Sequence, residues 1–271
     1  MTLQELFDQP TALPTAPRVV QELVASFDKA SVSTEEIARK VSLDPVLSAK
    51  LLRLANSAYY NLSRSIGTVE DAVLMLGFVA VRTLVISSGL VNGFKSVTGL
   101  DLGDFWRYSM RTAVAAKWIA KQTRDNGELA FTIGMMHAIG QLVIHAAIPQ
   151  KAAALDAVAP PLDERRLAVE HEALGFTYAD VGAELARRWQ FPAVFSDAIA
   201  AFPAPHEHGA VDRLAAIVHV AAWRARALEA SRLAEQFPQE VANLVGLDAG
   251  TVIDDMPPLD ELAAGLDEMM K

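Results

Sequence analysis

Histidines are the residues of this chain best suited to metal or acid–base chemistry, and their spacing limits what they can do. The chain has six histidines and no cysteine, which excludes disulfides, thiolate zinc sites and cysteine nucleophiles. His171 and Glu172 are adjacent, so on a helix they point in different directions and cannot both ligate one metal. His206, Glu207 and His208 share a proline-flanked segment that is more typical of a polar loop. The histidine pattern alone therefore predicts no metal site.

Residues 33–56 suggest a second possible function, which is DNA binding. Two short helices are predicted there, joined by a turn as in a helix-turn-helix. The second helix carries Lys50, Arg53 and Asn56 on one stripe, and such side chains can contact bases and phosphates. An ordinary solvated helix face has the same composition, and a net charge of −9 lacks the basic footprint of a nucleic-acid binder. We keep DNA binding as a third hypothesis and expect no nucleic-acid partner.

The elements that must position these residues are predicted to be helices, and the fold class to be all-α. Hydrophobic residues make up 52% of the chain but aromatic residues only 7%, which favours closely packed helices over a β-sandwich. Ser33 with Glu36 three residues later is typical of a helix start, as is Asp44 followed by proline. Thr68 is expected to begin a helix that stops at Gly77.

The second half of the chain is predicted to hold longer helices after a joint at residues 97–103. One helix is expected to run from Asp104 to about Asn126, and a single apolar helix from Leu129 to Ile148. Further helices are expected over residues 163–174, 178–189, 192–201 and 210–235. The predicted domains are an N-terminal helical subdomain over 1–96, a helical bundle over 104–235 and an acidic helical tail over 236–271.

The tail combines negative charge with an apolar stripe. From Asp248 onward, seven acidic residues stand against the single basic residue Lys271. Apolar residues follow at helical spacing and predict an amphipathic helix: Leu259, Leu262, Ala263, Leu266 and Met270. This helix could dock on the protein itself or bind a basic partner.

Three runs of the sequence resemble the amino-terminal half of an HDOD domain, an HD-related output domain. They are LPTAPRVVQELV, ARKVSLDPVLSAKLLRLANSAYYN and IGTVEDAVLMLGFVAVRTLVIS, and the stretch from Asp44 to Tyr60 is the most specific. The resemblance covers about residues 13–227. It implies an HD-like helical bundle with an N-terminal helical subdomain, and a role in bacterial signal transduction through contacts with signalling proteins.

The run FTIGMMHAIGQLVI looks like the helix that carries the His-Asp pair of HD-type metal phosphohydrolases. His137 stands at the histidine position, but Ala138 replaces the aspartate. By the same resemblance, the other ligand positions hold Tyr108, Tyr178, Phe202 with Pro203, and Ala222. A methyl group cannot ligate a metal, and a lone imidazole holds no catalytic metal against water. We therefore predict no metal, no cofactor and no catalytic residue.

His137 has two interpretations. It is either a neutral core histidine with a hydrogen-bonded neighbour, or it contacts a ligand in a remodelled pocket with Tyr108, Tyr178 and Glu172. The resemblance places Glu172 toward that pocket and His171 toward solvent.

The leading hypothesis for the function is a non-catalytic regulatory module. The alternative is a metal-dependent phosphohydrolase acting on a nucleotide or another phosphoester. The chain contains no glycine-rich phosphate loop, no G-x-S-x-G elbow and no H-E-x-x-H helix. No uncharged apolar stretch of about 18 residues occurs either, so we expect a cytoplasmic location and no membrane contact.

Overall fold

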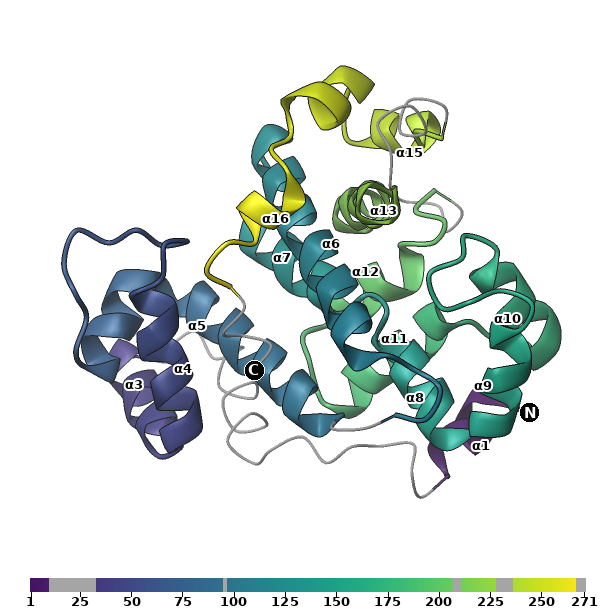
Figure 1. Cartoon of the computed structure of the whole chain (residues 1–271), viewed down its shortest axis with the longest axis horizontal. Helices are drawn as coiled ribbons and strands as arrows, with labels where there is room; N and C mark the ends of the chain where they lie inside the picture. The colour runs from purple at the N-terminus through teal and green to yellow at the C-terminus, as the bar shows by residue number, and fades with distance from the viewer. Residues whose placement is uncertain (10–32, 95–96, 207–210, 228–235, 267–271) are drawn as a thin grey trace. The chain divides into compact units, whose positions relative to one another are not determined.

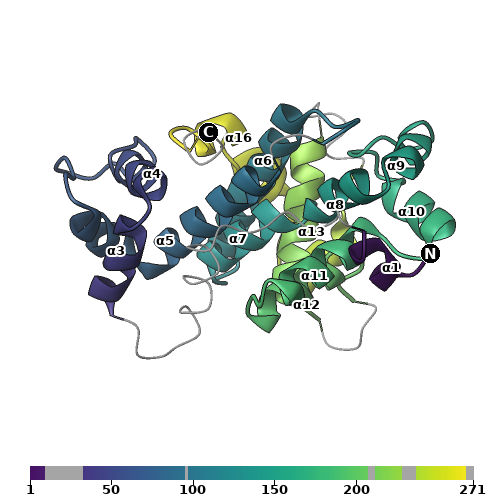
Figure 2. The same cartoon turned by 90° about the horizontal axis from the view of Figure 1, so that it is seen from below.

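Helices form the whole regular structure of the part of the chain that the structure describes. This computed structural model describes residues 1–9, 33–94, 97–206, 211–227 and 236–266, and none of these residues lies in a strand (Figures 1 and 2). The predicted all-α class is confirmed. The chain divides into two compact units: the larger takes its described residues from 1–14 and 94–256, the smaller from 15–93 and 257–271.

The larger unit is a bundle of helices. Its elements in chain order are α1 (Leu3–Phe7), α6 (Leu102–Gln122), α7 (Gly127–Met136), α8 (Ile139–Ala147), α9 (Pro149–Asp156), α10 (Arg166–Leu174), α11 (Tyr178–Arg188), α12 (Ala193–Ala201), α13 (Arg213–Arg226), α15 (Gln239–Leu244) and the π-helix η1 (Thr251–Asp255). Helix α6 packs against both α7 and α13, and α11 packs against α8 and α12. The cap of α6 is Asp101, three residues before the predicted start, because its carboxylate accepts the Asp104 N–H at 2.9 Å.

Two glycines allow the central helices of this bundle to approach closely. A Cβ on Gly134 of α7 would lie 2.9 Å from the Cα of Ala113 on α6. A Cβ on Gly140 of α8 would lie only 2.0 Å from the carbonyl oxygen of Tyr178 on α11. Real Cβ atoms do not approach that closely, so both contacts require glycine.

The predicted single helix from Leu129 to Ile148 is wrong. The chain instead forms α7 and α8, with a turn at His137 and Ala138 between them. Ala138 has φ −101° and ψ 4°, outside the helical region. The apolar pattern continues through the turn because both helices are buried on all sides, so the pattern does not mark the break.

The smaller unit contains α3 (Thr34–Ser42), α4 (Pro45–Ala55), α5 (Val69–Gly93) and α16 (Leu259–Leu262). Helices α3 and α4 both pack on α5. Three predicted starts are confirmed, since Ser33 and Asp44 cap α3 and α4, and the Thr68 hydroxyl accepts a backbone N–H in the first turn of α5. The predicted stop at Gly77 is also confirmed, because its φ of 80° interrupts α5.

The units are discontinuous in sequence, whereas the predicted domains follow one another along the chain. Helix α1 belongs to the larger unit, where Leu6 and Phe7 are buried and the Arg188 guanidinium lies 4.6 Å from the Phe7 ring centroid. Residues 257–266 belong to the smaller unit, where Leu259 and Leu266 are buried.

The predicted amphipathic helix over 259–270 is wrong in its extent. Helix α16 ends at Leu262, and Gly265 turns the chain with a φ of +86°. The predicted helix over 210–235 is also too long, because α13 ends at Arg226, where Ala227 has an extended backbone. Other predictions lie outside the described residues: the N-terminal run LPTAPRVVQELV, the loop residues Glu207 and His208, and Met270.

Two described helical stretches, Val69–Gly93 and Gly127–Ala147, are long and apolar enough to cross a membrane. The first is interrupted at Gly77, and the second at Ala138. In the second, 89% of the apolar window lies inside the protein. Core helices pass the same test, so these stretches are weak evidence for a membrane span.

Candidate functional site

The turn between α7 and α8 places His137 inside the bundle, fully buried, with both ring nitrogens hydrogen-bonded. Nδ1 lies 2.6 Å from the carbonyl oxygen of Gly134. A carbonyl only accepts, so Nδ1 carries the proton and Nε2 presents a lone pair. That lone pair accepts the hydroxyl proton of Tyr108 at 3.1 Å.

A cation at the end of α13 extends this chain of hydrogen bonds. Nη1 of Arg226 donates to the Tyr108 hydroxyl oxygen at 3.0 Å. Because arginine only donates, the direction of the whole chain is fixed: Arg226 donates to Tyr108, Tyr108 to His137, and His137 to Gly134. The structure therefore joins two of the predicted site residues, Tyr108 and His137, and adds Arg226, which the sequence analysis did not single out.

The protonation states of the pair follow from burial and from this cation. Burial lowers the pKa of His137 to about 3, and the positive charge of Arg226 acts in the same direction, against the hydrogen bond to Gly134. Burial raises the pKa of Tyr108, and the nearby Arg226 opposes the rise. At neutral pH the imidazole is therefore neutral and the phenol protonated, as the core interpretation of His137 expects.

Aromatic rings and alanine methyl groups surround His137 and Tyr178 in the core. The ring of Phe202, at the end of α12, lies 5.4 Å from the His137 ring and 6.1 Å from the ring of Tyr178. Ala138 and Ala222, which the resemblance places at the two aspartate positions, are completely or almost completely buried. Burial also raises the pKa of the Tyr178 hydroxyl, so it too stays protonated.

A catalytic metal does not fit this set of residues. The Nε2 lone pair of His137 is already used by Tyr108, and no carboxylate stands at Ala138 or Ala222. Across the described ranges, no group of three or more His, Asp or Glu side chains could hold a metal ion.

Glu172 does not line the site, contrary to the prediction. It is exposed on α10, as is His171, and the carboxylate buried there belongs to Glu170. Residues two apart on a helix point to nearly opposite faces, and the buried face of α10 is set by Arg166, Glu170 and Leu174 at intervals of four. That interval was visible in the sequence and would have identified Glu170.

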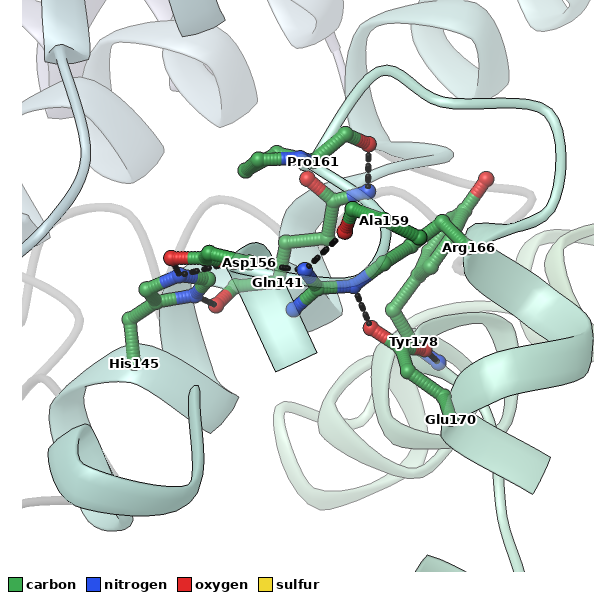
Figure 3. Close-up of polar contacts among 8 residues, drawn as sticks. All are labelled: Gln141, His145, Asp156, Ala159, Pro161, Arg166, Glu170 and Tyr178. Atoms are coloured by element: carbon green, nitrogen blue, oxygen red, sulfur yellow. Dashed lines mark hydrogen bonds and ion pairs between the residues drawn. The ribbon is translucent and has the colours of Figure 1, made fainter. Parts of the chain in front are cut away.

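Glu170 and Arg166 form a buried ion pair within α10, and Glu170 connects it to α11 (Figure 3). Nε of Arg166 donates to one carboxylate oxygen of Glu170 at 2.7 Å, and the backbone N–H of Tyr178 donates to the other at 2.6 Å. The carboxylate thus takes one of the free N–H groups at the start of α11. Burial raises the pKa of Glu170, while Arg166 opposes the rise.

The same network reaches α8 and α9 through Asp156. Nη1 of Arg166 donates to Asp156 at 2.5 Å and to the carbonyl of Ala159 at 2.8 Å, and Nε2 of His145 lies 3.0 Å from the Asp156 carboxylate (Figure 3). Gln141 donates to the Pro161 carbonyl at 2.6 Å. These contacts hold α9, α10 and the loop between them against α8, and through Glu170 they hold the start of α11, where Tyr178 lies.

The predicted DNA-reading stripe is exposed only in part. Lys50 is buried and donates to the Ser88 hydroxyl at 2.9 Å. The Asn56 amide binds the backbone of Ile66 as donor and acceptor, at 2.8 Å each. Arg53 and Asn56 are exposed, but the Asn56 side chain is occupied by Ile66.

The family follows from comparison with known proteins. A family model described as the HDOD domain matches residues 13–205, more than half of the chain. The chain belongs to the HDOD family. The matched range includes Tyr108, His137 and Tyr178, whereas Ala222 and Arg226 of this HDOD chain lie beyond it.

Solved structures share the HD-like helical fold, as predicted. A protein of Shewanella amazonensis SB2B, named as a candidate phosphohydrolase, is 31% identical; the match covers 99% of this chain and 96% of that one, with a TM-score of 0.79. A protein of Marinobacter aquaeolei VT8, named as a candidate signal transduction protein, is 25% identical, with 95% and 58% covered and a TM-score of 0.73.

A curated relative is much longer than the HDOD chain. An uncharacterised protein of Treponema pallidum is 25% identical over 182 residues, and the match covers 66% of this chain but only 35% of that protein. The match therefore spans about a third of the length of that relative.

Proposed function

We propose that this HDOD chain is a non-catalytic regulatory module of bacterial signal transduction that acts through contacts with signalling proteins. The observation that carries the proposal is the hydrogen bond from Tyr108 to Nε2 of His137. This hydrogen bond uses the nitrogen lone pair that a metal would need, and the ring of Phe202 packs against the same imidazole. The relative from Marinobacter aquaeolei, named for signal transduction, supports the regulatory part.

The alternative is a phosphohydrolase, as the relative from Shewanella amazonensis is named. An HD-type metal would polarise a phosphate and activate a water, and it needs carboxylate ligands that Ala138 and Ala222 cannot supply. Incubation of the full chain with Mn²⁺, Fe²⁺ or Mg²⁺ and a panel of nucleotides and p-nitrophenyl phosphate should give no turnover above the metal-only control. Turnover that is lost in His137→Gln would support the hydrolase instead.

Partner binding is tested through exposed apolar side chains of the smaller unit. Leu43 at the end of α3 and Val46 in the first turn of α4 are 72% and 57% exposed, and Leu74 and Met75 on α5 are 61% and 43% exposed. Large exposed apolar groups that lie close together often mark protein contacts. We expect the tagged full chain to capture a defined signalling protein from its native host. One of the double variants, Leu43→Glu with Val46→Glu or Leu74→Glu with Met75→Glu, should lose it.

Each double variant is the control for the other, because both add two negative charges to exposed positions of the same unit. Equal capture by wild type and both variants, or capture of no defined protein, would refute the role of these surfaces in partner contact.

A further inference from the structure

A surface cleft lies beside the buried site, on the other side of Arg226. It encloses about 290 Å³, near the lower end of the volumes of about 300–1,000 Å³ that are usual for small-molecule sites. The loop before α10 lines one side with Leu162 to Arg165, and the end of α13 lines the other with Trp223 and Arg226. All these residues belong to the larger unit.

Arg226 brings a charge to this cleft that the described residues leave without an ion pair. Its hydrogen bond among them is the one from Nη1 to Tyr108, and no carboxylate of the described chain lies within ion-pair distance of its guanidinium. Arg166, by contrast, is paired with Asp156 and Glu170. The Glu164 carboxylate attracts the guanidinium from a distance without an ion pair, so no anion of the described chain is in direct contact with Arg226. Its free donors suit an anion from outside the chain.

The acidic side chains of the cleft do not cancel this charge. Asp163 accepts three hydrogen bonds from Arg165, two from the guanidinium at 3.0 and 2.7 Å and one from the backbone N–H at 2.8 Å. Arg165 therefore already compensates Asp163. Glu164 is exposed at the cleft and forms no ion pair with Arg226. Its negative charge disfavours a dianion more than a monoanion.

The other side chains of the cleft offer an apolar surface and one free donor. Trp223 lies one helical turn before Arg226, on the same face of α13, and is 92% buried, given its exposed fraction of 8%. Its indole N–H has no hydrogen-bond acceptor in the described structure. Leu162, opposite, is 40% exposed. A ligand with an apolar body and an additional oxygen would match these groups.

We propose that this cleft binds a small organic monoanion: a carboxylate held by Arg226, with an apolar or aromatic body between Trp223 and Leu162. The planar guanidinium fork matches a carboxylate with two parallel hydrogen bonds. Through this site a small molecule would regulate the module. It does not depend on the proposed protein contacts, since a chain that captures no partner could still bind the anion.

The test uses the full chain and matched pairs of probes. Benzoate, phenylacetate, indole-3-acetate and hexanoate are titrated by calorimetry beside their neutral amides and beside phenyl phosphate. We expect at least one carboxylate to bind once per chain and at least about tenfold more tightly than its amide, because the amide loses the charge-assisted contact. Equal binding of the acid and its amide, no binding by any carboxylate, or tighter binding of phenyl phosphate would overturn the proposal.

Variants locate the binding to the cleft. Arg226→Met should weaken carboxylate binding by at least about tenfold, whereas Arg187→Met, an exposed arginine paired with Glu184 on α11, should leave it unchanged. Leu162→Glu changes an exposed loop residue and adds a negative charge to the cleft, so it should abolish binding even if Arg226→Met fails to fold. Undiminished binding by a folded Arg226→Met protein or by Leu162→Glu would overturn the proposal.

Discussion

His137 stands where the resemblance implies a metal ligand, and its neighbours hold it as a core residue. The imidazole is kept, but its proton is fixed on Nδ1 by Gly134, and its lone pair receives the Tyr108 hydroxyl. Arg226 orients that hydroxyl by donating to its oxygen. The side chain is therefore held neutral by burial and by a positive charge nearby, two conditions that disfavour protonation.

The low pKa of His137 predicts a loss of stability in mild acid. The unfolded chain protonates this imidazole near pH 6.5, the folded chain only near pH 3, so between these values the unfolded state holds the extra proton. The contribution of His137 to stability is complete above pH 6.5 and falls by about 1.4 kcal/mol for each pH unit below it. Urea unfolding from pH 7.5 to 4.5 should show this slope.

His137→Gln should be less stable than wild type at pH 7 but should lose less stability on acidification. His219→Gln is the comparison variant, because burial also lowers the pKa of that histidine. Measuring both variants separates the contribution of His137 to the pH dependence of stability from that of His219. Parallel stability profiles for wild type and His137→Gln would contradict the assigned protonation state.

Among the helices, the junction of α8 with α11 depends on a backbone contact. Gly140→Ala would place a methyl carbon 2.0 Å from the Tyr178 carbonyl oxygen, and neither backbone can move without displacing a buried helix. We expect a loss of about 3 kcal/mol or more in the free energy of unfolding. Gly67→Ala, where nothing lies within 4 Å of the added carbon, should change it by less than about 0.5 kcal/mol. Similar denaturation midpoints for the two variants would refute this packing.

Helix ends marked by local chemistry could be predicted from the sequence, whereas tertiary contacts could not. The caps at Ser33, Asp44 and Thr68 need only a side-chain oxygen and the next turn of backbone, so their signal is local. The break between α7 and α8 lies within an apolar run, and so does the contact of Gly140 with α11, so neither has a local signal. The burial of Lys50 likewise follows from Ser88, 38 residues away.

The candidate site was predicted in part for the same reason. The resemblance identified Tyr108, His137 and Tyr178. In the structure, His137 contacts the rings of Tyr108 and Phe202, and Tyr178 contacts Phe202. It also placed Glu172 inward, where the structure has Glu170. Arg226 could not be inferred, because its role depends on the phenol of Tyr108 from a helix 118 residues earlier.

The two discontinuous units make the end of the chain part of the smaller one. Leu259 and Leu266 are buried, and a Cβ on Gly265 would lie 3.2 Å from the Ser57 side chain. Truncation before Pro257 should therefore lower the melting temperature by several degrees, since losing two buried leucines costs about 3–5 kcal/mol. Differential scanning fluorimetry of the truncated and full chains measures this.

Glu261→Lys in the full chain, which reverses an exposed charge of α16, should leave the melting temperature nearly unchanged. If the truncated chain keeps its melting temperature and loses the captured partner, the segment is a binding element instead of a structural one. Unchanged melting and unchanged capture would refute both roles.

The metal content of the purified protein tests most directly whether this HDOD chain lacks the metal site of the HD-type phosphohydrolases. The full chain is dialysed against metal-free buffer, and iron, manganese, zinc and nickel are measured by elemental analysis beside His137→Gln and His206→Ala. We predict far less than one ion per chain in all three proteins, because the Nε2 of His137 is bonded to Tyr108 and alanines stand at the carboxylate positions. About one ion per chain in the wild type, retained through dialysis and lost in His137→Gln, would contradict the account.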